Sequence, residues 1–216
     1  MNKKLKSFWQ NNKSFFLFIS LMLVFRSAVA DWNEVPTGSM KPTIVEGDRI
    51  FVNKMAYDLR VPFTHISLMK IAEPQRSDII IFDSVAADKK LVKRIIGVPG
   101  DVISMKDNVL SINGKTLSYK PLGKTNNIVS HTEDLLGNKH PINTKMPGSK
   151  LSNFSAVKVP NDQFLVLGDN RDNSADSRVI GFVPRTEIVG KAKNVIVSLN
   201  YDNYYLPRGD RFLQEL

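Results

Sequence analysis

The sequence predicts an all-β fold with antiparallel strands, preceded by one N-terminal transmembrane helix. Two observations support the β fold: short runs rich in Val, Ile and Phe recur along the 216 residues, and Gly or Pro residues separate them. One observation supports the helix, because a strongly apolar stretch follows a lysine-rich leader near the N-terminus. Beyond that stretch, no amphipathic helical pattern of a dozen residues is convincing.

The leader covers residues 1–13, and the apolar stretch covers residues 14–30 with Arg26 as its one charge. Seventeen residues lie at the low end of what a spanning helix needs. Basic residues precede the stretch, while Asp31 and Glu34 follow it, so we expect the N-terminus inside and the remainder outside. An uncleaved signal anchor and a signal peptide cleaved after Ala28-Val29-Ala30 are both open from the residues alone. The basic leader argues against a third interpretation, a buried core helix.

Composition excludes several classes of protein. The chain has no cysteine, which excludes a disulfide framework, a cysteine nucleophile, thiolate zinc sites and iron–sulfur clusters. The net charge is +9, but residues 1–30 hold five basic residues and no acid. The other 186 residues therefore carry only +4, and we expect no nucleic-acid partner.

The exported part divides into a core and an insertion. We expect a core over residues 31–114 and 158–216, the latter with a polar-aromatic tail, and a small β-rich cap over residues 115–157, which are more polar. Residues 109–117 predict a hairpin with a type I′ turn at Asn113-Gly114. The predicted core strands are Arg49–Lys54, Asp78–Phe82, Leu91–Ile96, Asp101–Met105, Phe164–Leu167 and Asn194–Leu199.

Two segments hold candidate catalytic residues. Ser39 lies in a loop that Pro36 and Pro42 stiffen, so its hydroxyl could be presented as a nucleophile; an ordinary turn is the alternative. Lys93 lies within an apolar strand, where alternation places it on one face with Leu91 and Ile95. If that face is inward, desolvation lowers the pKa of the lysine and makes it a general base; a solvent-facing lysine is the alternative.

A third segment, residues 168–178, is a dense loop of Asp, Asn and Arg side chains. It does not fit the calcium-binding loop pattern, because Ser174 occupies the glycine position and the terminal Glu is missing. Neither an H-E-x-x-H motif nor a G-x-S-x-G motif is present in the sequence. We therefore expect no metal and no cofactor.

Together these segments resemble the boxes of bacterial type I signal peptidases, which are membrane-anchored serine proteases with a Ser/Lys dyad. The resemblance rests on four ordered segments between residues 35 and 184: Pro36-Thr37-Gly38-Ser39-Met40-Lys41-Pro42-Thr43, Gly47–Lys54, Lys93–Asp101, and Gly168–Arg178 followed by Gly181-Phe182-Val183-Pro184.

The resemblance implies a role for each matching residue. Ser39 would be the nucleophile, neutral Lys93 the general base, and Ser174 the hydroxyl that orients the lysine. The backbone N–H of Ser39 and the hydroxyl of Thr37, where many relatives have Ser, would form the oxyanion hole. Asp176 and Arg178 would form a structural ion pair, and Asp169 and Arg171 would belong to the same scaffold. The substrate pockets would be lined by Val35, Pro36, Ile44, Leu91 and Val92.

The implied function is removal of signal peptides from exported preproteins after small-x-small sites. The implied location is the bacterial inner membrane, single-pass, with the catalytic domain on the extracytoplasmic side, close to lipid and to the secretion machinery. A retained anchor is then favoured, although Ala28-Val29-Ala30 stays a possible self-cleavage site. The alternatives are a specialised pilin or conjugation maturation peptidase and a tethered module that binds signal peptides without cutting. A self-cleaving Ser/Lys repressor is disfavoured, because an apolar stretch stands where its DNA-binding domain would be.

Overall fold

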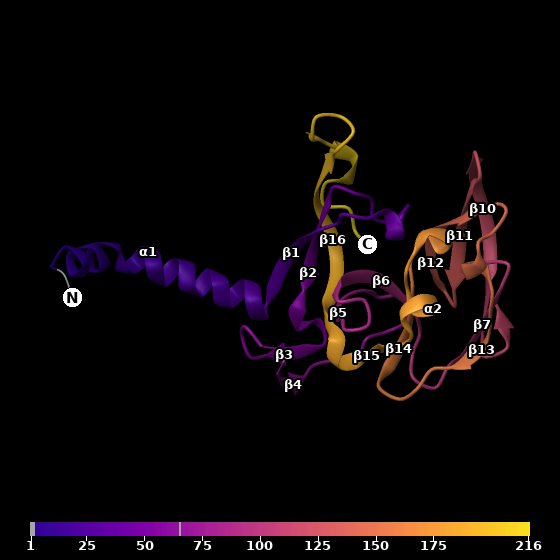
Figure 1. Cartoon of the computed structure of the whole chain (residues 1–216), viewed down its shortest axis with the longest axis horizontal. Coiled ribbons are helices and arrows are strands. Elements are labelled where there is room, and N and C mark those ends of the chain that lie inside the picture. Colours follow the sequence, from indigo (N-terminus) through magenta and orange to yellow (C-terminus); the bar gives the residue numbers. More distant parts are fainter. Residues whose placement is uncertain (1–2, 65) are drawn as a thin grey trace.

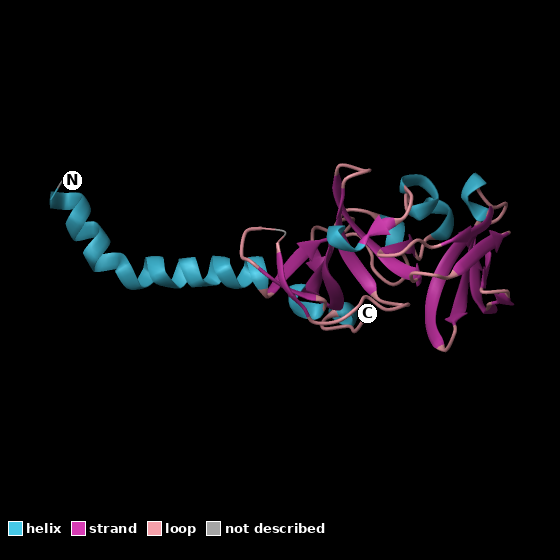
Figure 2. Ribbon diagram, turned by 90° about the horizontal axis from the view of Figure 1, so that it is seen from below, coloured by secondary structure: helices cyan, strands magenta, loops and turns pink. Residues whose placement is uncertain are grey.

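The computed structural model describes residues 3–64 and 66–216. A long helix, α1, extends away from a β-rich body, and its N-terminal end lies far from every strand (Figure 1). Viewed after a quarter turn, the strands fall into two groups, one next to α1 and one at the opposite end of the body (Figure 2). The predicted all-β class with antiparallel sheets is confirmed for this body.

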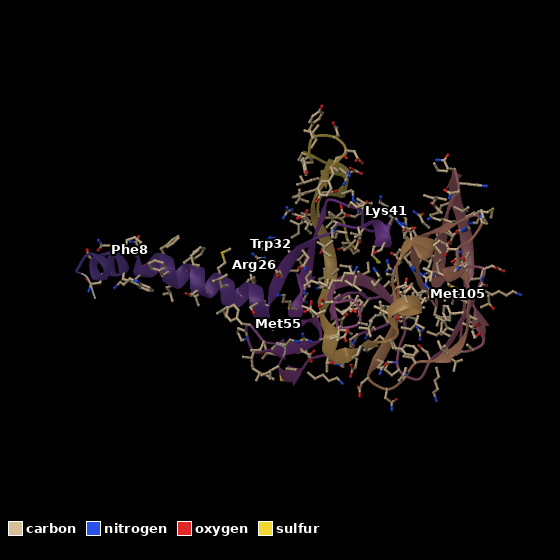
Figure 3. All side chains as sticks on the ribbon, viewed as in Figure 1. Phe8, Arg26, Trp32, Lys41, Met55 and Met105 are labelled. Carbon is tan, nitrogen blue, oxygen red and sulfur yellow. The ribbon has the colours of Figure 1, made fainter. Side chains whose placement is uncertain are left out.

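The helix α1 spans Lys3–Ala28. Among the described residues, no helix combines the length and the hydropathy required to cross a membrane, so the predicted spanning helix over residues 14–30 is not confirmed. Two features explain this. Helical structure stops at Ala28, and the polar run Asn11-Asn12-Lys13 and the charge of Arg26 bracket the apolar stretch. Arg26 forms an ion pair with Asp31 at 2.6 Å and lies over the ring of Trp32 at 4.2 Å, where α1 meets the first strand (Figure 3).

One eight-stranded antiparallel sheet forms the body next to α1. Its order is β1-β2-β16-β5-β6-β14-β15, and β17 pairs with the far end of β16. The strands are β1 (Ala30–Glu34), β2 (Asp48–Asn53), β5 (Ile79–Ser84), β6 (Lys89–Gly97), β14 (Gln163–Leu167), β15 (Val183–Pro184), β16 (Ile188–Asn200) and β17 (Leu206–Pro207).

Strand β5 is buried on both faces, which explains its continuous apolar run. Ile79 and Ile81 pack into a cluster with Val35, whereas Ile80 and Phe82 pack into a second cluster with Ile95. The strand therefore lies between two apolar clusters. Its neighbour β6 contacts both clusters, through Val92 and Ile95.

Three smaller antiparallel sheets complete the fold. At the end of the body remote from α1, one sheet has the order β13-β7-β8-β9 and another β10-β11-β12; the third is the hairpin β3-β4 close to α1. These strands are β3 (Asp58–Arg60), β4 (Ser67–Lys70), β7 (Val102–Lys106), β8 (Val109–Ile112), β9 (Lys115–Thr116), β10 (Ser118–Thr125), β11 (Ile128–Leu135), β12 (Asn138–Lys145) and β13 (Phe154–Lys158).

The predicted hairpin turn is confirmed, since Asn113 and Gly114 both have positive φ between β8 and β9. Strands β7 and β8 pair with β13 and β9 of the expected cap, so one sheet crosses residue 114. The division at residues 114 and 157 stays a prediction. Short helical turns join the strands: η1 (Gly38–Met40), η2 (Lys54–Ala56), η3 (Lys150–Ser152), η4 (Arg171–Asn173), α2 (Ser177–Ile180), η5 (Arg185–Glu187) and η6 (Gly209–Arg211).

Candidate active site

Ser39 and Lys93 meet although 54 positions separate them in the chain. Ser39 lies in η1, the turn between β1 and β2, and Lys93 lies in the middle of β6. The Nζ atom of Lys93 is 2.7 Å from the Oγ atom of Ser39 and 3.0 Å from the carbonyl oxygen of Val92. The two candidate residues thus form a direct contact between a hydroxyl and an amine.

Lys93 is buried, with 2% of its surface exposed. Burial disfavours its charged form and lowers its pKa to about 8, although the carboxylates of Asp176 and Asp169 act in the opposite direction. About a tenth of the Lys93 amines are therefore neutral at pH 7, against about one in 3,000 for an ordinary lysine. An amine in this state can accept a proton from the hydroxyl that it touches.

Asp169 contacts both strand β6, which carries Lys93, and the loop that carries Ser39. Its two carboxylate oxygens accept hydrogen bonds from Arg94 at 2.8 and 2.7 Å, and Arg94 is the residue next to Lys93. The hydroxyl of Thr43, four residues after Ser39, also donates to Asp169 at 2.5 Å. One buried carboxylate therefore ties the Ser39 loop to the Lys93 strand.

The predicted pair of Asp176 and Arg178 is formed, with a shortest distance of 2.6 Å. Asp176 also accepts from the backbone N–H of Gly168, which anchors the start of the polar loop. Arg171 does not pair with Asp169; it makes a two-pronged contact with Glu133 of β11 at 2.6 and 2.7 Å. The loop of residues 168–178 is thus bonded both to its own helix α2 and to the β10-β11-β12 sheet.

Two site residues were not singled out by sequence reasoning. Gly168 permits a close approach, because a Cβ there would lie 2.3 Å from the Ser174 Oγ atom and 2.4 Å from the Ser39 carbonyl oxygen. Asn170 donates from Nδ2 to the Gly38 carbonyl oxygen at 2.9 Å and from its backbone N–H to the Ser39 carbonyl oxygen at 3.1 Å. Both lie in the polar loop of residues 168–178, but only the folded backbone shows which neighbours they contact.

The predicted hydrogen bond from Ser174 to Lys93 is not formed. The Ser174 hydroxyl is buried and has no hydrogen-bond partner among the described residues, while Lys93 bonds to Ser39 and Val92. Thr37 is exposed, and its hydroxyl does not cap η1. The orienting role of Ser174 and the oxyanion role of Thr37 stay predictions.

The dyad opens into a cleft of about 460 Å³ between two sheet edges. Four of the five predicted pocket residues line it, namely Val35, Pro36, Leu91 and Val92. Ile44 does not line this cleft, because it is completely buried in the cluster that contains Val35 and Met40. A larger cavity of about 650 Å³ lies elsewhere, among residues such as Glu73, Pro99 and Phe164, and contains neither member of the dyad.

Two strands next to this cleft are incompletely paired. Within the part of the chain that the structure describes, β1 pairs with β2 alone, and the first residues of β6 pair with β5 but not with β14, whose pairing to β6 begins at Arg94. An extended peptide can therefore add to these edges by backbone hydrogen bonds, with its carbonyl next to Ser39. A hydroxyl nucleophile, a neutral amine and such a peptide together suffice for acyl transfer.

Comparisons with known proteins indicate the family to which this sequence is similar. Residues 8–197 match the model of a protein family described as "Signal peptidase, peptidase S26". A signal peptidase I from Pseudomonas fluorescens is 36% identical over 202 aligned positions, covering 86% of this chain and 71% of the relative. One from Rickettsia typhi is 36% identical over 214 positions, covering 89% and 80%. A solved signal peptidase I from Enterococcus faecalis V583 is 32% identical, covering 56% of this chain and 98% of the other, with a TM-score of 0.38.

Proposed function

The chain belongs to the signal peptidase family, peptidase S26, and on this basis we propose that Ser39 and Lys93 are its nucleophile and general base. It is a serine endopeptidase that removes signal peptides from exported preproteins. The observation that supports the dyad is the 2.7 Å contact between Ser39 Oγ and the buried Lys93 Nζ. Buried amines with a lowered pKa are suited to this task, because the base must be neutral before it can take a proton.

The reaction proceeds in two halves. Ser39 Oγ attacks the carbonyl carbon of the scissile peptide bond while its proton moves to Lys93 Nζ. The C–N bond then breaks, and Lys93 returns the proton to the leaving amine, which becomes the new N-terminus. Water attacks the resulting ester, Lys93 takes the proton from that water, and the free carboxyl product leaves as Ser39 regains its proton.

The negative charge that develops on the carbonyl oxygen needs hydrogen-bond donors. We assign these to the backbone N–H of Ser39 and the hydroxyl of Thr37, which lines the cleft. A single donor of this kind typically contributes about 2.7–4 kcal/mol to transition-state stabilisation. Asp169 and Asp176 hold neighbouring segments in place and do not take part in proton transfer.

The shape of the cleft supports recognition of small side chains. Val35, Pro36, Leu91 and Val92 supply an apolar lining to the cleft that contains Ser39. Because side chains of an extended peptide alternate, residues one and three before the cut face the same wall. Alanine at these two positions fits such a wall, whereas a large side chain would hold the scissile carbonyl away from Ser39.

The experiment that tests this function follows cleavage of a preprotein with an Ala-x-Ala site by the purified full-length chain in detergent. We expect one cut after the second alanine, read as a new N-terminus by mass spectrometry. Replacing either alanine of the substrate by leucine is expected to lower kcat/KM at least about 100-fold, since an ill-placed carbonyl alone has such an effect. Binding without any product would support the tethered binding module instead, and cutting of only one preprotein in a panel would support the specialised peptidase.

We also propose that the chain attaches to the bacterial inner membrane, with the β body on the extracytoplasmic side. Two features support attachment. In α1, the apolar side chains from Phe15 to Phe25 are largely exposed, and the hairpin β3-β4 next to it exposes Phe63, Ile66 and Leu68 by 62–68%. The backbone N–H of Phe63 donates to the Ser27 hydroxyl at 2.6 Å, so the hairpin is attached to the last turn of α1. The exposed apolar side chains of the helix and of the hairpin are therefore held next to each other, where lipid can cover both.

This attachment predicts the result of vesicle flotation with the full-length chain. Wild type is expected to float with vesicles of phosphatidylethanolamine and phosphatidylglycerol. Replacing Phe63, Ile66 and Leu68 by serine is expected to lower the bound fraction at limiting lipid at least about tenfold, because each side chain loses on the order of 1 kcal/mol or more of burial. The matched control replaces three exposed apolar residues remote from α1, Val102, Val109 and Leu122, and should float like wild type. Equal flotation of both variants would rule out the hairpin as part of the surface.

A further inference from the structure

The hydrogen bonds of Asn170 converge on the backbone of the Ser39 turn. Its Nδ2 atom donates to the Gly38 carbonyl oxygen at 2.9 Å, and its backbone N–H donates to the Ser39 carbonyl oxygen at 3.1 Å. Two successive carbonyl groups of η1 therefore point toward one residue. A planar peptide unit can rotate only if ψ of the residue before it and φ of the residue after it both change. A hydrogen bond to its carbonyl oxygen opposes this rotation, so the two bonds from Asn170 hold the orientation of the turn.

One of these planes carries the proposed oxyanion donor. The peptide unit between Gly38 and Ser39 holds the Gly38 C=O at one edge and the Ser39 N–H at the other. In a trans peptide the C=O and the N–H point in opposite directions. The Gly38 oxygen accepts from Asn170 Nδ2 and, at 3.2 Å, from the backbone N–H of Lys41. These bonds hold the oxygen on one side and therefore turn the Ser39 N–H toward the opposite side.

Asn170 is itself held from outside the site. The backbone N–H of Asn143 in β12 donates to the Asp169 carbonyl oxygen at 2.9 Å, and Asn143 forms a parallel bridge with Asn170. On its other side, the carbonyl oxygen of Asn170 accepts from the backbone N–H of Asn173 at 2.9 Å. The residue thus stands between the β10-β11-β12 sheet and the nucleophile turn.

We propose that Asn170 is a positioning residue for this reaction, which acts by aiming the backbone N–H of Ser39 at the developing oxyanion. This inference rests on the proposed function, because it presumes that Ser39 is the nucleophile. The Asn170 side chain does not touch the substrate carbonyl; it acts through the Gly38 oxygen. Its loss therefore weakens transition-state binding more than substrate binding.

Asn170→Ala tests the side-chain bond alone, because the backbone N–H of residue 170 can still donate to the Ser39 carbonyl oxygen. We expect kcat to fall about 10- to 100-fold with KM within about threefold of wild type, which is less than the loss of a whole oxyanion donor. Asn170→Asp keeps the shape but puts a carboxylate oxygen where the donor was, so its kcat should fall further. If only the volume of the side chain mattered, the aspartate variant would be the more active of the two.

A peptide aldehyde ending in Ala-x-alaninal gives a second readout. Its carbon accepts Ser39 Oγ, the Ser39 proton moves to Lys93, and the aldehyde oxygen becomes the anion in the oxyanion hole. Its affinity should fall in Asn170→Ala by the same factor as kcat/KM. Asn161→Ala, which changes an exposed loop asparagine, is the matched control and should behave like wild type.

The outcomes distinguish failure of this inference from failure of the proposed function. A wild type that cleaves the preprotein and binds the aldehyde, beside an Asn170→Ala variant with unchanged kcat and aldehyde affinity, would overturn this inference alone. If KM of Asn170→Ala rose by as large a factor as kcat fell, and the pH midpoint of its rate shifted as well, the whole Ser39 turn would have moved. This result would also overturn the inference. A wild type that neither cleaves nor binds the aldehyde would overturn the proposed function and the inference together.

Discussion

Replacing Lys93 by alanine is expected to lower kcat about 10⁴-fold or more, the largest effect among the substitutions considered. The variant keeps the Ser39 hydroxyl but removes the group that takes its proton at 2.7 Å, and loss of a catalytic-unit member has effects of this size. Lys93→Arg is expected to be equally inactive, since a guanidinium does not deprotonate. Lys106→Ala, at an exposed position of β7, is the control and should retain wild-type activity.

The pH profile of wild type is the companion measurement. The reactive form is neutral Lys93, whose burial lowers its pKa to about 8. The rate should therefore rise with pH up to a plateau, with a midpoint near 8. A profile that is flat from pH 6 to pH 10 would contradict a lysine base.

Unfolding experiments show whether an inactive variant is still folded. The pKa of Lys93 in the folded chain lies below that of the unfolded chain, so the folded chain binds fewer protons between these two values. Burial of Lys93 therefore lowers the free energy of unfolding most below about pH 8. The free energy of unfolding recovers as the pH rises toward the pKa of this lysine in the unfolded chain. Lys93→Met removes this reduction, and it should unfold at the same or higher urea concentration than wild type at pH 7 while being inactive.

Glu133→Gln is expected to lower the free energy of unfolding by about 3–5 kcal/mol, because it breaks a buried ion pair and leaves one charge alone. Glu133 and Arg171 are both fully buried, and two short contacts join them. Burial alone would raise the pKa of the Glu133 carboxyl, but the charge of Arg171 holds it far below its usual range. Urea unfolding of the full-length chain at pH 7 measures the effect.

The control for this prediction is Glu73→Gln, which removes the same charge from exposed ion pairs with Lys70 and Arg185. Exposed pairs contribute about 0–1 kcal/mol, so this variant should unfold close to wild type. Equal midpoints for the two variants would mean that the buried pair contributes no more than an exposed one.

Apolar runs predicted the core strands because those strands are buried. All six predicted runs overlap observed strands, and Ile80, Ile81 and Phe82 of β5 have no exposed surface. For the region of the β10-β11-β12 sheet, the sequence predicts a small β-rich cap but no individual strands. In β12, every second side chain is buried, but two of those three are His140 and Thr144. Hydropathy predicts that such polar residues are exposed. His140 is buried because it lies beside Glu133, which is itself buried and pairs with Arg171.

The sequence predicts which residues form the site, but it does not predict which atoms they contact. The order of the four motifs is enough to predict Ser39 and Lys93 from the sequence, and the structure places their side chains 2.7 Å apart. Sequence reasoning placed Ile44 in a pocket wall, but Ile44 faces the core, because a residue beside a cleft can point either way. The partners of Asn170 were beyond prediction, since they depend on backbone atoms more than 130 positions away.

The place of β16 in the main sheet has a consequence for the precision of the site. This strand, Ile188–Asn200, lies between β2 and β5, so it joins the half of the sheet that carries Ser39 to the half that carries Lys93. The register of β16 against both neighbours therefore sets how the two halves lie relative to each other. A slip of β16 against either neighbour would displace the serine from the lysine.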